Sequence, residues 1–246
     1  MKFKRTETGI PGLDDLLMGG IPTGRVVLIM GGPGTGKTIL CGQYLINGIK
    51  QFKESGVFVT LEESTQHIRE EMVQFGWDLG KMEEKNKLKI VDASPLRRNA
   101  EEQKLDKLLI GGREFSMVGL IDAIQRNVKK TDAKRLVVDG MAALIFQFPE
   151  ENKRRTAILD LIDSLISTKT TCLITLELKS SGMERILQAE EYLTDGVILM
   201  QTYKINKTFS RVIQVEKMRR SEIDHQPRPY RITNSGIEVF PKEAVF

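Results

Sequence analysis

Apolar residues rich in β-branched side chains occur in five short runs along the chain, each bounded by charged residues or glycines. These runs cover residues 26–30, 57–61, 88–91, 136–138 and 172–176. Their length and composition predict buried strands of a parallel sheet. Between them lie segments with helical spacing of apolar residues, at 39–52, 68–75, 117–128 and 155–166. The alternation predicts an α/β fold, with a mostly parallel sheet and helices on both faces.

The pattern changes after residue 196. Apolar and polar residues alternate over 197–203 and 211–215 around a polar turn at 204–208, which predicts an antiparallel hairpin. A further short strand is expected at 236–240. The charged stretch 96–113 lacks periodicity and is expected to be a surface excursion from the sheet edge. Because no repeat or Pro/Gly/Ser-rich linker divides the 246 residues, we expect residues 1–246 to form a single domain.

Composition is that of a globular protein, with 40 % hydrophobic and 28 % charged residues. No apolar run is long enough to span a bilayer, and residues 1–6 lack the apolar core of a secretory signal, so we expect a cytoplasmic protein without membrane contact. Cys41 and Cys172 are far apart and without partners at ligand spacing, which predicts core thiols. Met18, Met72 and Trp77 are also expected in the core.

One glycine-rich segment fits the pattern G-x-x-x-x-G-K-[ST], and it lies between a predicted strand and a predicted helix. Its residues are Gly31, Gly32, Pro33, Gly34, Thr35, Gly36, Lys37 and Thr38. In such a loop several backbone N–H groups point at phosphate oxygens, and the following helix adds its positive end. Lys37 would reach the β- and γ-phosphates, and Thr38 would place its hydroxyl on Mg²⁺. The segment therefore predicts binding of ATP and Mg²⁺.

Carboxylates end two other predicted strands. Asp139 follows a buried apolar run and is expected to hold Mg²⁺, through water, in the Walker-B role. Glu62 and Glu63 follow the strand at 57–61, where one carboxylate could orient or deprotonate the attacking water. Since adjacent residues of a strand point to opposite faces, we expect only one of them to face the γ-phosphate, with Glu62 preferred over Glu63.

Further motifs resemble the RecA superfamily, and specifically its KaiC-type domain, over nearly the whole chain. They begin with Thr-Gly-Ile-Pro-Gly-Leu-Asp at 8–14 and Gly-Gly-Ile-Pro at 19–22, and continue with Phe-Val-Thr-Leu-Glu-Glu-Ser at 58–64, Phe-Gly-Trp-Asp-Leu at 75–79 and Asp-Ala-Ser-Pro at 92–95. Single-domain KaiC-like proteins, some described as RadA paralogues, resemble the chain in length. The resemblance implies a RecA-like core in which ATP lies between the subunits of a ring, a hexamer in the family.

The resemblance also implies a trans-acting pair of cations. A Lys-x-Arg on a late strand of the family reaches the neighbouring subunit's γ-phosphate, and it matches Lys217 and Arg219. Arg220 and Ser221 then replace a common Gly-Thr pair. Gly140 replaces a common Ser after the Walker-B aspartate, which removes a hydroxyl near the metal and predicts slow turnover. The stretch 189–196 lacks the Ser-Thr pair that KaiC phosphorylates, which disfavours autophosphorylation.

These observations favour a homo-oligomeric, Mg²⁺-dependent ATP hydrolase. The basic clusters at 129–130, 153–155 and 219–220 leave a second hypothesis open, in which ATP gates binding of single-stranded DNA or of a RecA-family recombinase with little turnover. An autophosphorylating kinase is the third reading. Fold alone does not decide what work ATP performs.

Overall fold

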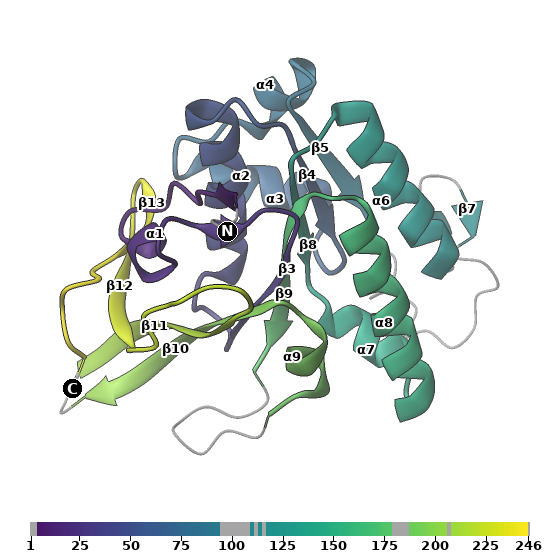
Figure 1. Ribbon diagram of the computed structural model, residues 1–246. Helices are drawn as coiled ribbons and strands as arrows, with labels where there is room; N and C mark the ends of the chain where they lie inside the picture. The colour runs from purple at the N-terminus through teal and green to yellow at the C-terminus, as the bar shows by residue number, and fades with distance from the viewer. Residues whose placement is uncertain are drawn as a thin grey trace.

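The computed structural model describes residues 4–93, 109–110, 113–114, 117–178, 187–205 and 208–245. The predicted excursion at 96–113 falls almost entirely outside them. A nine-stranded sheet forms the centre of the molecule (Figure 1). In spatial order its strands are β13 (Gly236–Val239), β12 (Arg228–Thr233), β11 (Thr208–Met218), β10 (Gly196–Ile205), β3 (Val26–Gly31), β9 (Thr171–Glu177), β8 (Arg135–Asp139), β4 (Gly56–Thr60) and β5 (Leu88–Asp92).

Strands β10, β3, β9, β8, β4 and β5 run parallel, while β10–β11, β11–β12 and β12–β13 pair antiparallel. The mostly parallel sheet with an antiparallel C-terminal part confirms the predicted fold class. Two small sheets flank it, one of β1 (Arg5–Thr6) with β2 (Ile21–Pro22) and one of β6 (Leu109–Ile110) with β7 (Arg113–Glu114).

Helices cover both faces of the sheet (Figure 1). On one face lie α1 (Leu13–Leu16), α2 (Lys37–Gln51), α3 (Thr65–Val73) and α4 (Leu79–Glu84); on the other lie α6 (Met117–Thr131), α7 (Ala142–Gln147), α8 (Glu151–Ser167) and α9 (Ala189–Leu193). Alternate residues of β3 divide between the two faces: Val27 and Ile29 pack against α2, and Val26, Leu28 and Met30 pack in the opposite core. Four of the five apolar runs are therefore inner strands of the sheet, and the fifth, β5, is the edge strand next to β4.

Several differences from the expected elements lie in the C-terminal region, and one concerns a methionine. The hairpin strands extend to Ile205 and Thr208, so the turn is shorter than expected. Strand β12 was not expected, because Pro229 and two arginines interrupt its apolar pattern. Met18 is 54 % exposed, contrary to its expected core position, and has a positive φ in the turn after α1.

The remaining expected core residues are buried: Met72, Trp77 and the free thiols Cys41 and Cys172. A search of the described residues found no helix both long and apolar enough to cross a membrane.

A buried arginine joins the first part of the chain to the middle of the sheet. Arg135 begins β8 and is 1 % exposed. Its Nε donates to Oε2 of Glu54 at 2.7 Å, and its Nη atoms donate to the backbone carbonyls of Tyr44 and Glu7 at 2.9 and 2.8 Å. The guanidinium passes so close to α2 that a Cβ at Gly48 would lie 2.4 Å from Cδ of Arg135. A glycine in the last turn of α2 therefore makes room for this side chain.

Candidate nucleotide site

The carboxyl ends of the central parallel strands surround a polar cavity of about 150 Å³. The loop 32–36 connects β3 to α2 at this end, so the backbone N–H groups of the first turn of α2 face the cavity side of the sheet. Lys37, Thr38, Glu62, Glu63 and Asp139 all line the cavity. Ligands of open parallel sheets bind at this edge.

Lys37 is folded back onto its own loop. Its Nζ donates to the backbone carbonyls of Gly31 and Gly32 at 2.8 and 3.1 Å. Burial lowers the pKa of Lys37, while the carboxylates of Glu177, Asp139 and Glu62 act in the opposite direction. The ammonium group of Lys37 is thus bound by two backbone carbonyls. Phosphate oxygens, which accept stronger charge-assisted hydrogen bonds, could replace these carbonyls as its acceptors.

A hydrogen-bonded chain joins α2, β8 and β9 across the cavity. Oγ1 of Thr38 donates to Oδ2 of Asp139 at 3.0 Å, and Oγ1 of Thr175 donates to Oδ1 of Asp139 at 2.6 Å. The backbone N–H of Gly140 in turn donates to Oγ1 of Thr175 at 2.8 Å. Burial raises the pKa of Asp139, whereas the hydrogen bonds from Thr175 and Thr38 oppose the shift. The carboxylate is thus fixed in position beside the hydroxyl of Thr38.

Glu62 and Glu63 do not lie on a strand, contrary to the premise that only one of them could face the site. Strand β4 ends at Thr60, and residues 61–63 form a bend. The hydroxyl of Thr60 donates to the backbone carbonyl of Glu63 at 2.7 Å and accepts from its N–H at 3.1 Å, which shapes this bend. Both glutamates line the cavity as a result. The side chain of Glu63 is 39 % exposed, and its Oε2 lies 3.8 Å from Nδ1 of His67.

The sequence matches the family described as ATPase: KaiC over residues 6–244. The chain belongs to the KaiC ATPase family. A UPF0273 protein of Methanocaldococcus jannaschii is 34 % identical over 243 residues, covering 99 % of both chains. The crystal structure of a KaiC-like protein of Pyrococcus horikoshii has a TM-score of 0.83 and 34 % identity, over 98 % of this chain and 100 % of that one.

The circadian clock oscillator protein KaiC of Prochlorococcus marinus is 35 % identical over 246 residues, but this chain spans only 48 % of its length. Membership of the KaiC family makes the chain a P-loop ATPase with a RecA-like fold, and hence a nucleotide-binding protein.

The Lys-x-Arg of the KaiC resemblance lies far from the P-loop of its own chain. In the sheet register Val197, the partner of Lys217 in β11, is also the parallel partner of Leu28, and Met200 is the partner of Gly31. Lys217 is therefore level with Leu28, about 10 Å along the strand direction from Gly31, and Arg219 lies further toward the start of β3. Nζ of Lys217 donates to the backbone carbonyls of Glu191 and Thr194 at 2.8 and 2.6 Å, at the end of α9.

The cavity is also lined by residues that the sequence patterns did not indicate. Thr175 and Glu177 both line the cavity. They end the apolar strand β9, and two polar residues at the carboxyl end of a parallel strand are the signal that could have revealed them. Tyr230 of β12 holds the glycine-rich loop 32–36, since its hydroxyl donates to the backbone carbonyl of Thr35 at 2.5 Å.

Proposed function

We propose that the protein hydrolyses ATP in a Mg²⁺-dependent reaction, as a homo-oligomer in which ATP lies between neighbouring copies. The observation that carries the proposal is the hydrogen bond between Thr38 and Asp139, in a cavity also lined by Lys37, Glu62 and Glu63. A cation for the β- and γ-phosphates, a hydroxyl and a carboxylate for the metal, and a carboxylate for the water are the parts that phosphoryl transfer to water requires.

The oxygen atoms near the P-loop fit Mg²⁺. The hydroxyl of Thr38 and the carboxylate of Asp139 are hard oxygen donors, 3.0 Å apart. Mg²⁺ prefers one or two protein oxygens, completed by phosphate oxygens and water, over a full protein cage. When bound, Mg²⁺ would neutralise charge on the phosphates.

The reaction assigned to this site is attack of water on the γ-phosphorus. The bond from the γ-phosphorus to the bridging oxygen breaks, and the products are ADP and inorganic phosphate. Lys37 would leave the carbonyls of Gly31 and Gly32 and bind phosphate oxygens. Glu62 would accept a hydrogen bond from the attacking water and take up its proton. Glu62 is preferred because it lies against Gly140, next to Asp139, whereas Glu63 turns toward His67.

Oligomerisation is proposed because Lys217 and Arg219 are remote from the P-loop of their own chain. Only another copy could bring these cations to the γ-phosphate, where they would stabilise charge in the transition state. Such a contact is head-to-tail, and it closes into a ring when the rotation between copies permits. The hexamer suggested by the resemblance is one such ring.

Light scattering together with phosphate release tests the proposal. The chain is measured with and without ATP and Mg²⁺, beside Lys37→Ala. We expect an oligomer that forms or tightens with ATP, phosphate release that requires Mg²⁺, and at least about a hundredfold loss of ATP affinity in Lys37→Ala, because two or more charge-assisted hydrogen bonds are lost. Retained micromolar affinity in this variant would contradict the site assignment. A monomer that binds ATP without turnover would instead favour the nucleotide-gated binding module.

A further inference from the structure

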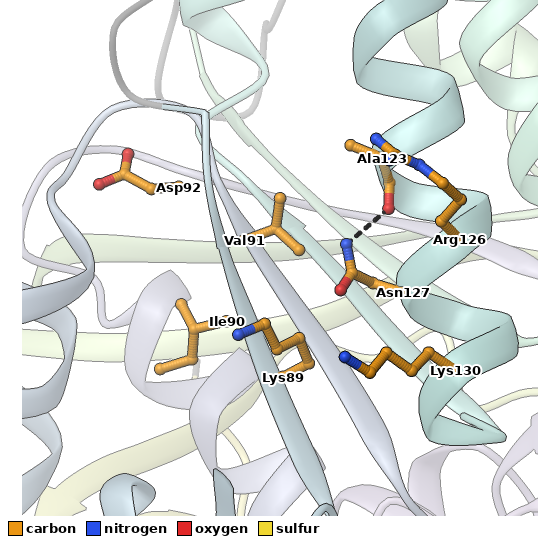
Figure 2. Close-up of a pocket in the computed structure, with 8 residues that line it drawn as sticks. All are labelled: Lys89, Ile90, Val91, Asp92, Ala123, Arg126, Asn127 and Lys130. Atoms are coloured by element: carbon orange, nitrogen blue, oxygen red, sulfur yellow. Dashed lines mark hydrogen bonds between the residues drawn. The ribbon is translucent and has the colours of Figure 1, made fainter. Parts of the chain in front are cut away.

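A second cleft, of about 470 Å³, opens between β5 and α6 at the edge of the sheet (Figure 2). Strand β5 is separated from β3 by four strand spacings, so the cleft lies about 19 Å from the strand that leads into the P-loop. Its floor is apolar, formed by Val91 and Ala123, which are 8 % and 6 % exposed. A volume of this size is typical of sites for small molecules.

Three cationic side chains surround this apolar floor. Lys89 extends from β5, and Arg126 and Lys130 extend from α6. None of the three has an ion-pair partner within the part of the chain that the structure describes; Nε of Arg126 donates only to the backbone carbonyl of Asp122. Arg126 and Lys130 are also four residues apart on one helix, and two like charges at this spacing disfavour the helix. An anion in the cleft would relieve this repulsion.

The net charge of the residues that line the cleft favours a negatively charged ligand. Asp92 is the one carboxylate among the described lining residues, so three cations and one anion leave a net charge of +2. Nδ2 of Asn127 donates to the backbone carbonyl of Ala123 at 2.7 Å, and its carbonyl oxygen therefore faces β5 (Figure 2). This oxygen can accept a hydrogen bond from a ligand hydroxyl.

The edge of β5 is closed to an added strand at its centre. The N–H of Ile90, which points away from β4, donates to Oε1 of Glu83 at 3.3 Å, and Oε2 of Glu83 is held by Arg69 at 2.8 Å. A peptide that extended the sheet would have to displace this carboxylate. The geometry therefore favours a small ligand over an extended chain.

We propose that the cleft between β5 and α6 binds a compact dianion of the phosphate-monoester kind that carries a small apolar group. Lys89 and Lys130 would bind the phosphate oxygens, Arg126 would add positive charge toward the other end of the cleft (Figure 2), and the apolar group would cover Val91 and Ala123. The chemistry is that of charge-assisted hydrogen bonds above an apolar floor. This site is separate from the P-loop and does not depend on the proposed hydrolysis.

Calorimetric titration with phenyl phosphate tests the proposal. Because the P-loop also binds phosphate, the titration uses the full chain carrying Lys37→Ala. In this background Lys89→Gln with Lys130→Gln removes two cations from the cleft. The matched control, Lys87→Gln with Lys129→Gln, removes two exposed cations that neighbour them in sequence but do not line the cleft.

We expect saturable binding of phenyl phosphate, at least about tenfold weaker in the cleft variant and within about twofold in the control, since one hydrogen bond to a charged group contributes 1.5 kcal/mol or more. Inorganic phosphate should bind more weakly than phenyl phosphate, because it leaves the apolar floor uncovered. Equal weakening in both variants, absence of saturable binding, or equal affinity for the two probes would overturn the proposal. Unchanged circular dichroism of the variants shows that any loss is not unfolding.

Discussion

Gly140 lies directly against Glu62: a Cβ atom at position 140 would stand 2.6 Å from Cγ of Glu62 and 2.9 Å from its Cδ. The φ of Gly140 is +92°, in a region that side chains rarely adopt. The serine that is common at this position in the KaiC family would therefore not fit here unless the side chain of Glu62 moved. The side chain of Glu62 occupies the space that a side chain at position 140 would need. The glycine therefore does not by itself indicate slow turnover.

Gly140→Ser should lower turnover, although it restores the hydroxyl common in the family. The new side chain would push Glu62 out of the cavity and strain the backbone, at a cost of about 1–3 kcal/mol in stability. We expect at least about a tenfold loss of kcat, measured by phosphate release. Gly24→Ala is the matched control, because Gly24 also has a positive φ but a Cβ there would meet only one atom, at 3.7 Å. Turnover equal to or above wild type in Gly140→Ser would contradict the contact.

The variants Glu62→Gln and Glu63→Gln should show which of the two carboxylates activates the attacking water. If Glu62 accepts the proton of water, its amide variant should lose about a hundredfold or more in kcat with ATP affinity retained. Glu63→Gln should lose less than about tenfold, because Glu63 is half-exposed and turned toward His67. Single-turnover phosphate release measures both. A larger loss in Glu63→Gln would transfer the role to that residue.

Two inactive variants should restore activity when mixed, if the cations act between copies. Lys37→Ala lacks a working P-loop, and the double variant Lys217→Ala with Arg219→Ala lacks the cations. In an equimolar random oligomer about a quarter of the interfaces would pair an intact P-loop with an intact donor, so we expect about a quarter of wild-type turnover in a closed ring. Phosphate release after co-refolding measures this. A mixture as inactive as its components would exclude trans action.

Asp139→Asn should stabilise the ligand-free protein at neutral pH while abolishing Mg²⁺-dependent turnover. Burial raises the pKa of Asp139 above its ordinary value of 3.8 in the folded protein. The folded state then binds the proton more tightly than the unfolded state, so this residue favours folding at low pH and opposes it as pH rises from 3.8 through the folded pKa. The Tm of Asp139→Asn minus that of wild type should therefore increase with pH above 3.8. A difference that is constant or falls with pH would contradict this sign.

Arg135→Ala should be among the most destabilising single substitutions. It removes the donors to the buried carbonyl of Tyr44, to the carbonyl of Glu7 and to the carboxylate of Glu54, and breaking a buried ion pair costs about 3–5 kcal/mol. Urea unfolding measures the loss. Lys134→Ala, which removes the adjacent exposed ion pair with Asp132, should cost less than about 0.5 kcal/mol. Similar losses in both variants would show that the buried network contributes little.

The parallel core and the P-loop could be predicted because each rests on local patterns. An apolar run such as Val26 to Gly31 fixes a buried strand, and Lys37 and Thr38 are fixed by spacing from the glycines. The bend that brings both Glu62 and Glu63 to the cavity depends on the hydroxyl of Thr60, which no periodicity reveals. Likewise Thr175 reaches Asp139 only because β8 and β9 are neighbours in the sheet, which is a long-range property.

Contacts from late strands explain the rest of what the sequence did not reveal. Tyr230 and Thr35 are 195 residues apart, and the hydrogen bond between them became visible only with the order β13-β12-β11-β10-β3. Pro229 and the arginines of β12 interrupt the apolar pattern of this strand, although Tyr230 binds the carbonyl of Thr35 and Ile232 lies beside Gly36. Local pattern thus predicts the loop itself but not what supports it.

The bond from Tyr230 to Thr35 also orders events during synthesis on the ribosome. The glycine-rich loop is among the first segments to emerge, yet its support is translated almost two hundred residues later. The side chain of Gln43 in α2 likewise depends on a late residue, Ile237. Its Nε2 donates to the backbone carbonyl of Ile237 at 3.0 Å, and its Oε1 accepts from the backbone N–H of Ile237 at 2.6 Å. A nascent chain therefore lacks these contacts to the glycine-rich loop and to α2 until its last strands have been translated.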